Sequence, residues 1–284
     1  MRDKMRRSQN PKMIINFTQQ WKEGKPVFKV REDCFDRRIH EVAPVCESAA
    51  KEMICRLHYS HSFPAARRRF GLFRRGELIG VAVFSHPVND KVLTNAFGGK
   101  AAESLELGRF IIADVENSFN AETHFISCCR RELKREGFRG FVAFADDYAR
   151  TNAKNEIVFG GHAGKIYGAS SSVYTGRGCS SQVRLLPDGK IFPKRAISKI
   201  RNNESGQEYA CQVLVSFGAD LPPSDSLERK LWLKVWLDKL TRTGKHPGCH
   251  RYLFPLQKNI PLPKSLPYPK LKFSDLQLSL KLNY

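Results

Sequence analysis

The chain has 284 residues, 41% of them hydrophobic and 11% aromatic, which is enough apolar material for one sizeable globular domain and argues against a disordered chain. Its 48 Lys and Arg against 28 Asp and Glu give a formal net charge of +20, and such an excess favours a polyanionic partner such as nucleic acid. With no run of about 18 apolar residues and no regular spacing among its eight cysteines, we expect a soluble, cytoplasmic protein with no membrane partner, no disulfide framework and no zinc cluster.

The first third of the chain predicts a basic arm, a helix and a hairpin. Residues 1–45 mix basic residues with β-formers, so this arm is expected to add an edge strand or to lie along DNA. Apolar residues recur at helical spacing over 49–58, which predicts an amphipathic helix that ends at the polar sequence HYS. Two apolar runs, 70–73 and 78–84, flank Arg75-Gly76 and predict a β-hairpin with a tight turn.

The middle of the chain reads strand, helix, strand, short helix, strand. In the strand 105–113, alternation places Arg109 and Glu106 on opposite faces, so they are not expected to pair with each other. Asn120 is the expected N-cap of a helix over 121–135 that stops at Gly137. A buried strand over 141–145 delivers Asp146 and Asp147 at its carboxyl end, and helical turns over 163–169 and a strand over 173–175 follow.

Beyond residue 178 the periodicity weakens. A turn in LLPDGKIFP, a strand over 209–217 and a helix over 227–243 are predicted, the last with a capping box at Asp225 and its tryptophans in the core. The Pro-rich end is expected to be extended over the surface or a partner. We divide the chain into the arm 1–45, a catalytic core 46–186 and a C-terminal extension 187–284 with one amphipathic helix and a Pro-rich tail.

Several short sequences occur together and in a fixed order. They are HYS at 58–60, GVAVFSHP at 80–87, ELGRF at 106–110, NAET at 120–123, AFAD at 143–146, GKIYGASSSVYTG at 164–176, HRY at 250–252 and LPYPK at 266–270. In this combination they resemble the Mom-type DNA modification proteins of bacteriophage Mu and its relatives, and the element order resembles the GNAT acetyltransferase fold. The resemblance implies an α/β (α+β) fold with a mixed, mostly antiparallel central sheet flanked by helices.

The resemblance also implies a function. Mom-type proteins convert the exocyclic amine of adenine in phage DNA to a carbamoylmethyl-type derivative that protects the genome from host restriction, in the host cytoplasm. This agrees with the charge, which by itself indicates only a polyanion. Two other readings stay open: a CoA-dependent N-acetyltransferase acting on a protein, a tRNA or a hypermodified base, and a non-catalytic DNA-binding protein on the same scaffold.

Five residues are the candidates for the catalytic site. Asp146, after a buried strand, is the expected base that accepts the proton of the attacking amine, although a cap or loop role is equally familiar. Tyr167 lies where the fold has a tyrosine that protonates a leaving group. His58, Tyr59 and Arg109 are expected to form the walls of the site, with Tyr59 or Phe63 stacking on a flipped base.

The segment expected to bind the acyl donor differs from that of the fold that the chain resembles. ADVENSFNAET replaces the usual Gly-rich loop before the long helix, which puts standard coenzyme A binding in doubt. Acetyl-CoA or a related acyl donor is expected, held by Asn120, Thr123 and Ile111. One iron ion on His58, Asp146 and Tyr167 is a further possibility, which the spacing does not test.

The expected partner is double-stranded DNA, with a homodimer also considered. Two basic clusters, one around the hairpin and one along the long helix, form the predicted phosphate-binding surface, although any single charge run is usually a solvated face. The residues of the two clusters are Arg67, Arg68, Arg69, Arg74, Arg75, Arg130, Arg131 and Lys134.

Overall fold

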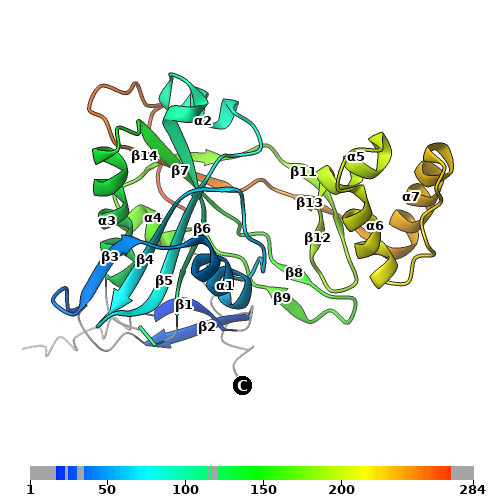
Figure 1. The fold of residues 1–284 in the computed structure, drawn as a ribbon, viewed down its shortest axis with the longest axis horizontal. Coiled ribbons are helices and arrows are strands. Elements are labelled where there is room, and N and C mark those ends of the chain that lie inside the picture. Colours follow the sequence, from blue (N-terminus) through cyan, green and yellow to red (C-terminus); the bar gives the residue numbers. More distant parts are fainter. Residues whose placement is uncertain (1–16, 23–24, 31–34, 114, 117–119, 270–284) are drawn as a thin grey trace, which may run out of the picture.

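A seven-stranded sheet forms the body of the protein in the computed structural model, which describes residues 17–22, 25–30, 35–113, 115–116 and 120–269 (Figure 1). Its strand order is β10-β14-β7-β6-β5-β4-β3, and every neighbouring pair is antiparallel except β6 with β7. The strands are β3 (His40–Pro44), β4 (Ala66–Arg74), β5 (Glu77–Ser85), β6 (Ser104–Ile112), β7 (Gly140–Ala145), β10 (Val173–Arg177) and β14 (His250–Pro255). The predicted mixed, mostly antiparallel α/β fold is confirmed.

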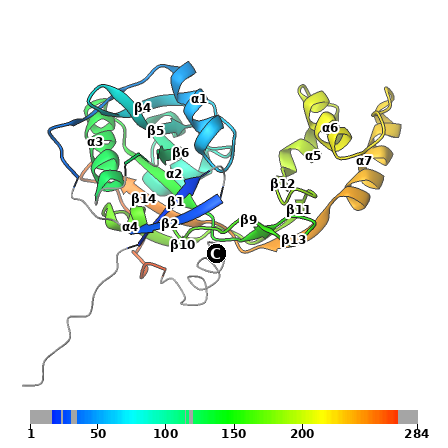
Figure 2. The same ribbon diagram turned by 90° about the horizontal axis from the view of Figure 1, so that it is seen from below.

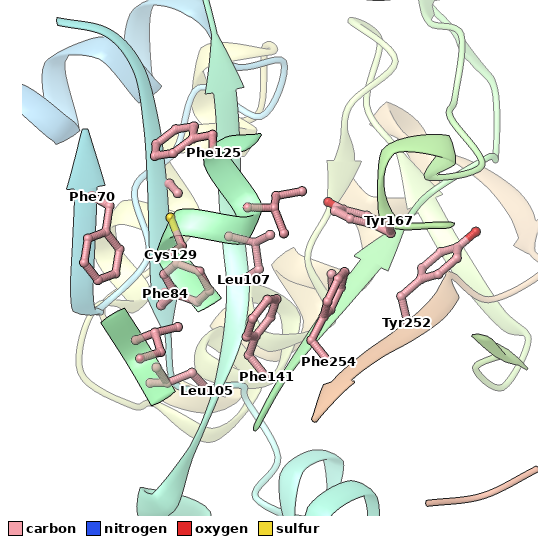
Figure 3. Close-up of a cluster of buried hydrophobic side chains, with 14 of the residues drawn as sticks. Phe70, Phe84, Leu105, Leu107, Phe125, Cys129, Phe141, Tyr167, Tyr252 and Phe254 are labelled. Atoms are coloured by element: carbon pink, nitrogen blue, oxygen red, sulfur yellow. The ribbon is translucent and has the colours of Figure 1, made fainter. Parts of the chain in front are cut away.

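Helices cover both faces of this sheet. On one face, α3 (Ala121–Arg135) and the short α4 (Lys165–Ala169) pack on the largest apolar cluster, part of which Figure 3 shows. On the other, α1 (Glu47–Leu57) covers β5 and β6, and α2 (Lys91–Phe97) covers β7 and β14. A 3₁₀ turn, η1 (Ala101–Glu103), leads into β6. Because β6 and β7 run parallel, the chain crosses between them through α3.

Most elements predicted in this part are confirmed. The hairpin turn is at Arg75 and Gly76, both with positive φ (50° and 85°), as a tight turn between twisted strands requires. Gly137, at φ 85°, ends α3, and the N–H of Phe138 donates back to the Leu133 carbonyl. The capping role of Asn120 is wrong: the residue is left-handed, with φ 68°, and its side chain makes no cap hydrogen bond.

A smaller lobe is inserted between β10 and β14. It contains β11 (Ser181–Leu185), β12 (Ile191–Phe192) and β13 (Arg242–His246), paired in the order β12-β11-β13, and the helices α5 (Lys194–Asn202), α6 (Gln207–Ser216) and α7 (Ser226–Leu240). The three helices enclose a separate apolar core. Figures 1 and 2 show the lobe projecting sideways from the sheet, beyond the hairpin of β8 (Arg150–Thr151) and β9 (Ile157–Phe159).

The lobe corrects two expectations. The predicted strand 209–217 is wrong, because this segment is the helix α6, which buries Ala210, Cys211 and Leu214 at helical spacing against α5 and α7. The capped helix is confirmed, with Asp225 accepting from the N–H groups of Leu227 and Glu228, but it ends at Leu240. Arg242 and Thr243, expected to complete it, instead begin β13.

The ends of the described chain also contribute to the body. β3 adds an edge strand to the sheet, and β1 (Phe17–Lys22) pairs with β2 (Lys25–Val30) as a separate hairpin. The segment 187–284, expected as an extension, supplies β14 between β10 and β7. The Pro-rich segment is extended over β10: Leu266 N–H donates to the Tyr174 carbonyl at 2.9 Å. Among the described helices, none has the length and apolarity needed to cross a membrane.

Candidate active site

A β-bulge in β6 organises the candidate site. β5 pairs with β6 at Val83 with Arg109 and then at Phe84 with Leu107, which leaves Gly108 as the extra residue. The extra residue reverses the alternation, so that Leu107 and Phe110 both face α3. The prediction that Glu106 and Arg109 lie on opposite faces is therefore wrong, because the bulge turns both toward the α1 side.

The two parallel strands separate at the same point. Their pairing ends at Leu107 with Ala143, beyond which β6 is paired only with β5. The polar residues of the site lie around this separation: Glu106 and Arg109 on β6, Asp146 just after β7, and Tyr167 on α4. Strand separation therefore makes room for polar groups inside a covered sheet.

His58 and Arg109 meet at the end of α1. The Nδ1 atom of His58 accepts from the N–H of Ser60 at 3.1 Å and contacts the Ser60 hydroxyl at 2.9 Å, so the ring proton is on Nε2. Burial, and then the charge of Arg109, lower the pKa of His58 to about 3. Arg109 donates to the carbonyl and hydroxyl oxygens of Ser62 at 2.9 and 2.8 Å. A neutral histidine thus adjoins a fixed guanidinium, as expected for a wall of the site.

Tyr59 belongs to an aromatic cluster. Its ring lies 4.2 Å from that of His58 and 4.7 Å from that of Phe159, with His162 at 6.0 Å. Burial, followed by the charge of Asp146, raises the pKa of Tyr59 to about 12. The ring already packs on two others, which argues against its predicted role of stacking on a flipped base. Phe63, the other candidate, packs against the apolar cluster under α1.

Asp146 is held by three donors. Its carboxylate accepts from Tyr148 N–H at 2.9 Å, Arg150 Nη1 at 3.0 Å and His246 Nε2 at 3.0 Å. His246 comes from β13, so this carboxylate connects the sheet to the lobe. With its oxygens engaged in this way, Asp146 is better suited to position its neighbours than to accept a proton.

The neighbouring Asp147 joins a second, partly buried network. It accepts from Arg177 Nη1 at 2.6 Å and from His250 Nε2 at 3.1 Å, while His250 Nδ1 contacts the Tyr174 hydroxyl at 2.7 Å. Burial raises the pKa of Asp147, but the hydrogen bonds from Arg177 and His250 outweigh it and leave the pKa lowered. This network ties the end of β7 to β14 and β10, a structural role.

Tyr167 is buried beside the site on α4. Its ring lies 5.2 Å from that of Tyr252 and edge-on to Phe254 at 6.2 Å (Figure 3). Burial, and then the proximity of Tyr59, raise the pKa of Tyr167 above the usual value for a phenol. The phenol therefore keeps its proton at neutral pH, as a general acid must.

Glu106 is the site residue that the sequence reasoning missed. Burial raises the pKa of its carboxyl, although the nearby Arg109 and His86 lower it. Among the described residues its carboxylate has no hydrogen-bond donor, which contrasts with the three donors on Asp146. Such a carboxylate suits a general base. The ELGRF sequence contained it, but strict alternation put it on the wrong side of the strand.

The ligand set considered for iron is not supported. Nδ1 of His58 is occupied by Ser60, and Asp146 is occupied by Arg150 and His246. The structure instead places ligand atoms of Asp146, His246 and Cys249 within 4.8 Å of one another. His246 Nδ1 accepts from Gly248 N–H at 3.0 Å, so Nε2 holds the proton and has no lone pair for a metal.

The expected donor-binding residues lie on β6 and at the start of α3. The Ile111 side chain lies in the apolar cluster under α1, on the face of the sheet opposite α3. Thr123 Oγ1 donates to the Asn120 carbonyl at 3.0 Å, a hydrogen bond within the first turn of α3. A role of Asn120, Thr123 and Ile111 in holding an acyl donor therefore stays a prediction.

Most of the predicted DNA-binding arginines are engaged within the chain. The partners are Ser104 and Ala102 carbonyls for Arg67, Glu136 for Arg68, Glu47 for Arg69, the Val115 carbonyl for Arg74, the Ser170 carbonyl for Arg130 and Cys128 for Arg131. Arg130 also packs over the Phe254 ring at 5.6 Å and turns inward, contrary to expectation. Arg68, Arg75, Arg131 and Lys134 are exposed, and of these the side chains of Arg75 and Lys134 make no hydrogen bond or ion pair within the described part of the chain. Fewer of the predicted DNA-binding side chains are thus available to contact phosphate than the sequence indicated.

Comparison with known proteins gives one family. The sequence model of the Mom protein family matches residues 40–274, which is most of the chain and includes the whole candidate site. No curated protein matches the chain in sequence.

Two solved structures are similar in part. A probable acetyltransferase from Staphylococcus epidermidis ATCC 12228 is 12% identical, with a TM-score of 0.25 over 41% of this chain and 56% of its own. A tandem GNAT protein from the clavulanic acid biosynthesis pathway, without AcCoA, is 7% identical, with a TM-score of 0.35 over 70% of this chain and 65% of its own. Neither similarity extends to the whole fold, whose assignment rests on the sheet described above.

Proposed function

The chain belongs to the Mom protein family, and from this premise we propose that it is a phage DNA-modifying transferase that alters the exocyclic amine of adenine. The product is a carbamoylmethyl-type derivative that shields the genome from restriction. The observation that carries the proposal is the group of ionisable side chains at the separation of β6 and β7, inside the part of the chain that matches the family.

The proposed chemistry assigns different tasks to the carboxyls and the phenol. An amine that attacks an electrophilic carbon must lose a proton, and Glu106, with its raised pKa and no hydrogen-bond donor among the described residues, is the base that we favour. Tyr167 keeps its proton and supplies it to the departing atom of the donor. Asp146 holds Arg150 and His246 in place, and Arg109 supplies a fixed positive charge.

Adenine inside a duplex is paired, so the base must leave the helix before it reacts. The tight packing of Tyr59 on His58 and Phe159 suggests that this cluster forms a wall of the site, and that stacking on the base falls to another group. Unpairing costs a few kcal/mol, which binding to the neighbouring phosphates must offset.

The test is the mass of the adenine nucleosides from DNA of cells that express the protein. We expect a heavier adenosine species with the wild type and its loss, at least about 100-fold, with Glu106→Gln, because a general base contributes that much or more. Glu77→Gln is the matched control, since Glu77 is an exposed carboxyl on β5. An unshifted adenine pool with the wild type would reject the proposed function.

The same assay, combined with thermal unfolding, distinguishes the roles of Asp146 and Glu106. Asp146→Asn should lower both the modification and the melting temperature, because it weakens the contacts with Arg150 and His246. Glu106→Gln should leave the melting temperature and DNA affinity nearly unchanged. The reverse pattern would return the role of base to Asp146.

A further inference from the structure

The inserted lobe presents a basic helix face that the sequence reasoning did not single out. On α5, Ala196, Ile197 and Ile200 point into the lobe core. The opposite side carries four cations, two lysines and two arginines: Lys194, Arg195, Lys199 and Arg201. Helical periodicity places all four outside the apolar stripe, so one face is apolar and the other is positive.

These cations are only lightly engaged within the chain. Arg195 pairs with Glu204 at 2.5 Å. Lys194 and Arg201 are exposed, and neither makes an ion pair or a hydrogen bond with any residue in the described part of the chain. This differs from the arginines of the β4–β5 hairpin, most of which are held by carbonyl or carboxylate oxygens.

The lobe is joined to the candidate site by polar contacts as well as by the chain. His246 on β13 donates to Asp146 at 3.0 Å, and Arg242 Nη2 donates to Thr151 Oγ1 at 2.8 Å. In Figures 1 and 2, α7 is the helix farthest from the sheet, and α5 lies between it and the body. A polymer bound along α5 is thereby held at a defined position relative to the site.

We propose that the basic face of α5 (Lys194, Arg195, Lys199 and Arg201) binds the phosphate backbone of duplex DNA and positions it for the site. The nine residues of α5 extend about 14 Å, and duplex DNA carries one charge per about 1.7 Å of axis, so the face matches several phosphates. This inference rests on the proposed function for the identity of the polyanion. In this proposal the four cations of α5, and not the hairpin arginines, supply most of the affinity for DNA.

Duplex binding by Lys194→Gln/Lys199→Gln/Arg201→Gln in the full chain tests the proposal. We expect the affinity at moderate salt to fall about tenfold or more. The slope of log K against log salt should fall by roughly two to three, because each lost phosphate contact removes about 0.9. The control Arg74→Gln/Arg75→Gln/Lys134→Gln removes the same charge from the earlier predicted surface. It should change affinity less than threefold.

Equal losses in the two triple variants, or a larger loss in the control, would overturn the proposal. Matching thermal unfolding midpoints would show that both variants are folded. This binding assay does not depend on catalysis: an active wild type with unchanged α5-variant affinity rejects only the inference, whereas an inactive wild type that binds DNA through α5 rejects only the proposed reaction.

Discussion

Two histidines that stay neutral define the site at the scale of single residues. His58, 6% exposed, has its pKa lowered to about 3 by burial, and His162 has its pKa lowered to about 4 for the same reason. Both are therefore uncharged at neutral pH, despite the carboxylates of Asp146 and Asp147 near His162. Protonation of either histidine is unfavourable in the folded state but not in the unfolded chain, so their titration is coupled to stability.

We predict that the protein loses stability as pH falls below about 6.5. The unfolded chain protonates His58 near the ordinary histidine pKa of 6.5, while the folded chain resists protonation down to about 3, so acid favours the unfolded state. The slope from this group approaches about 1.4 kcal/mol per pH unit. Urea unfolding at pH 7, 6 and 5 measures it.

The matched variants are His58→Gln and His61→Gln. The first should reduce the pH dependence without abolishing it, because His162 keeps its lowered pKa, whereas the second should leave it unchanged, because His61 is exposed on the surface. A wild-type stability that is level between pH 7 and 5 would contradict the buried, neutral state of His58.

The bulge of β6 is the decisive feature at the scale of elements. A Cβ built on Gly108 would lie 2.5 Å from Ser85 Oγ, so only glycine fits while the serine is present. The close approach lets β6 shift its alternation and turn Glu106 toward Arg109.

Gly108→Ala should therefore lower the free energy of unfolding by about 1–3 kcal/mol, as overpacking does, and reduce adenine modification. The double variant Ser85→Ala/Gly108→Ala should recover most of the stability, because the nearest remaining Ser85 atom, Cβ, lies 3.5 Å away. Chemical denaturation of the two variants and of Ser85→Ala alone measures the coupling. Additive effects would mean that the contact with Ser85 is not the cause.

At the scale of the whole molecule, the sheet body and the lobe have separate hydrophobic cores. The sheet body is packed around residues such as Phe141 and Leu105, and the lobe around Leu214 and Trp232. β11 and β13 connect the lobe to the sheet along the chain, and contacts such as those of His246 with Asp146 and of Ala153 N–H with the Pro187 carbonyl join it to the body.

We predict that the cores respond separately to mutation. Leu214 is fully buried, so Leu214→Ala should cost about 2–5 kcal/mol and mainly lower the hydrogen-exchange protection of amides in α5–α7. Leu105→Ala, also fully buried, is the counterpart and should affect β5–β7 instead. Equal loss of protection in both regions after Leu214→Ala would show one cooperative unit.

Much of the sheet body followed from local pattern. The hairpin, the crossover helix and the strand that precedes Asp146 were all predicted, because their periodicity and turn residues agree with their final environment. The segment 209–217 was mistaken for a strand, because a short apolar run has no decisive period until a neighbouring helix selects one face.

The sequence by itself determined the class of fold, the resemblance to the Mom-type proteins and the short motifs of the site, since these depend on neighbours along the chain. Only the tertiary structure decided how those motifs act. The bulge turned Glu106 toward Arg109, the lobe brought His246 to Asp146, and packing engaged most of the predicted DNA-binding arginines. Each of these depends on contacts between residues far apart in the chain, which periodicity does not encode.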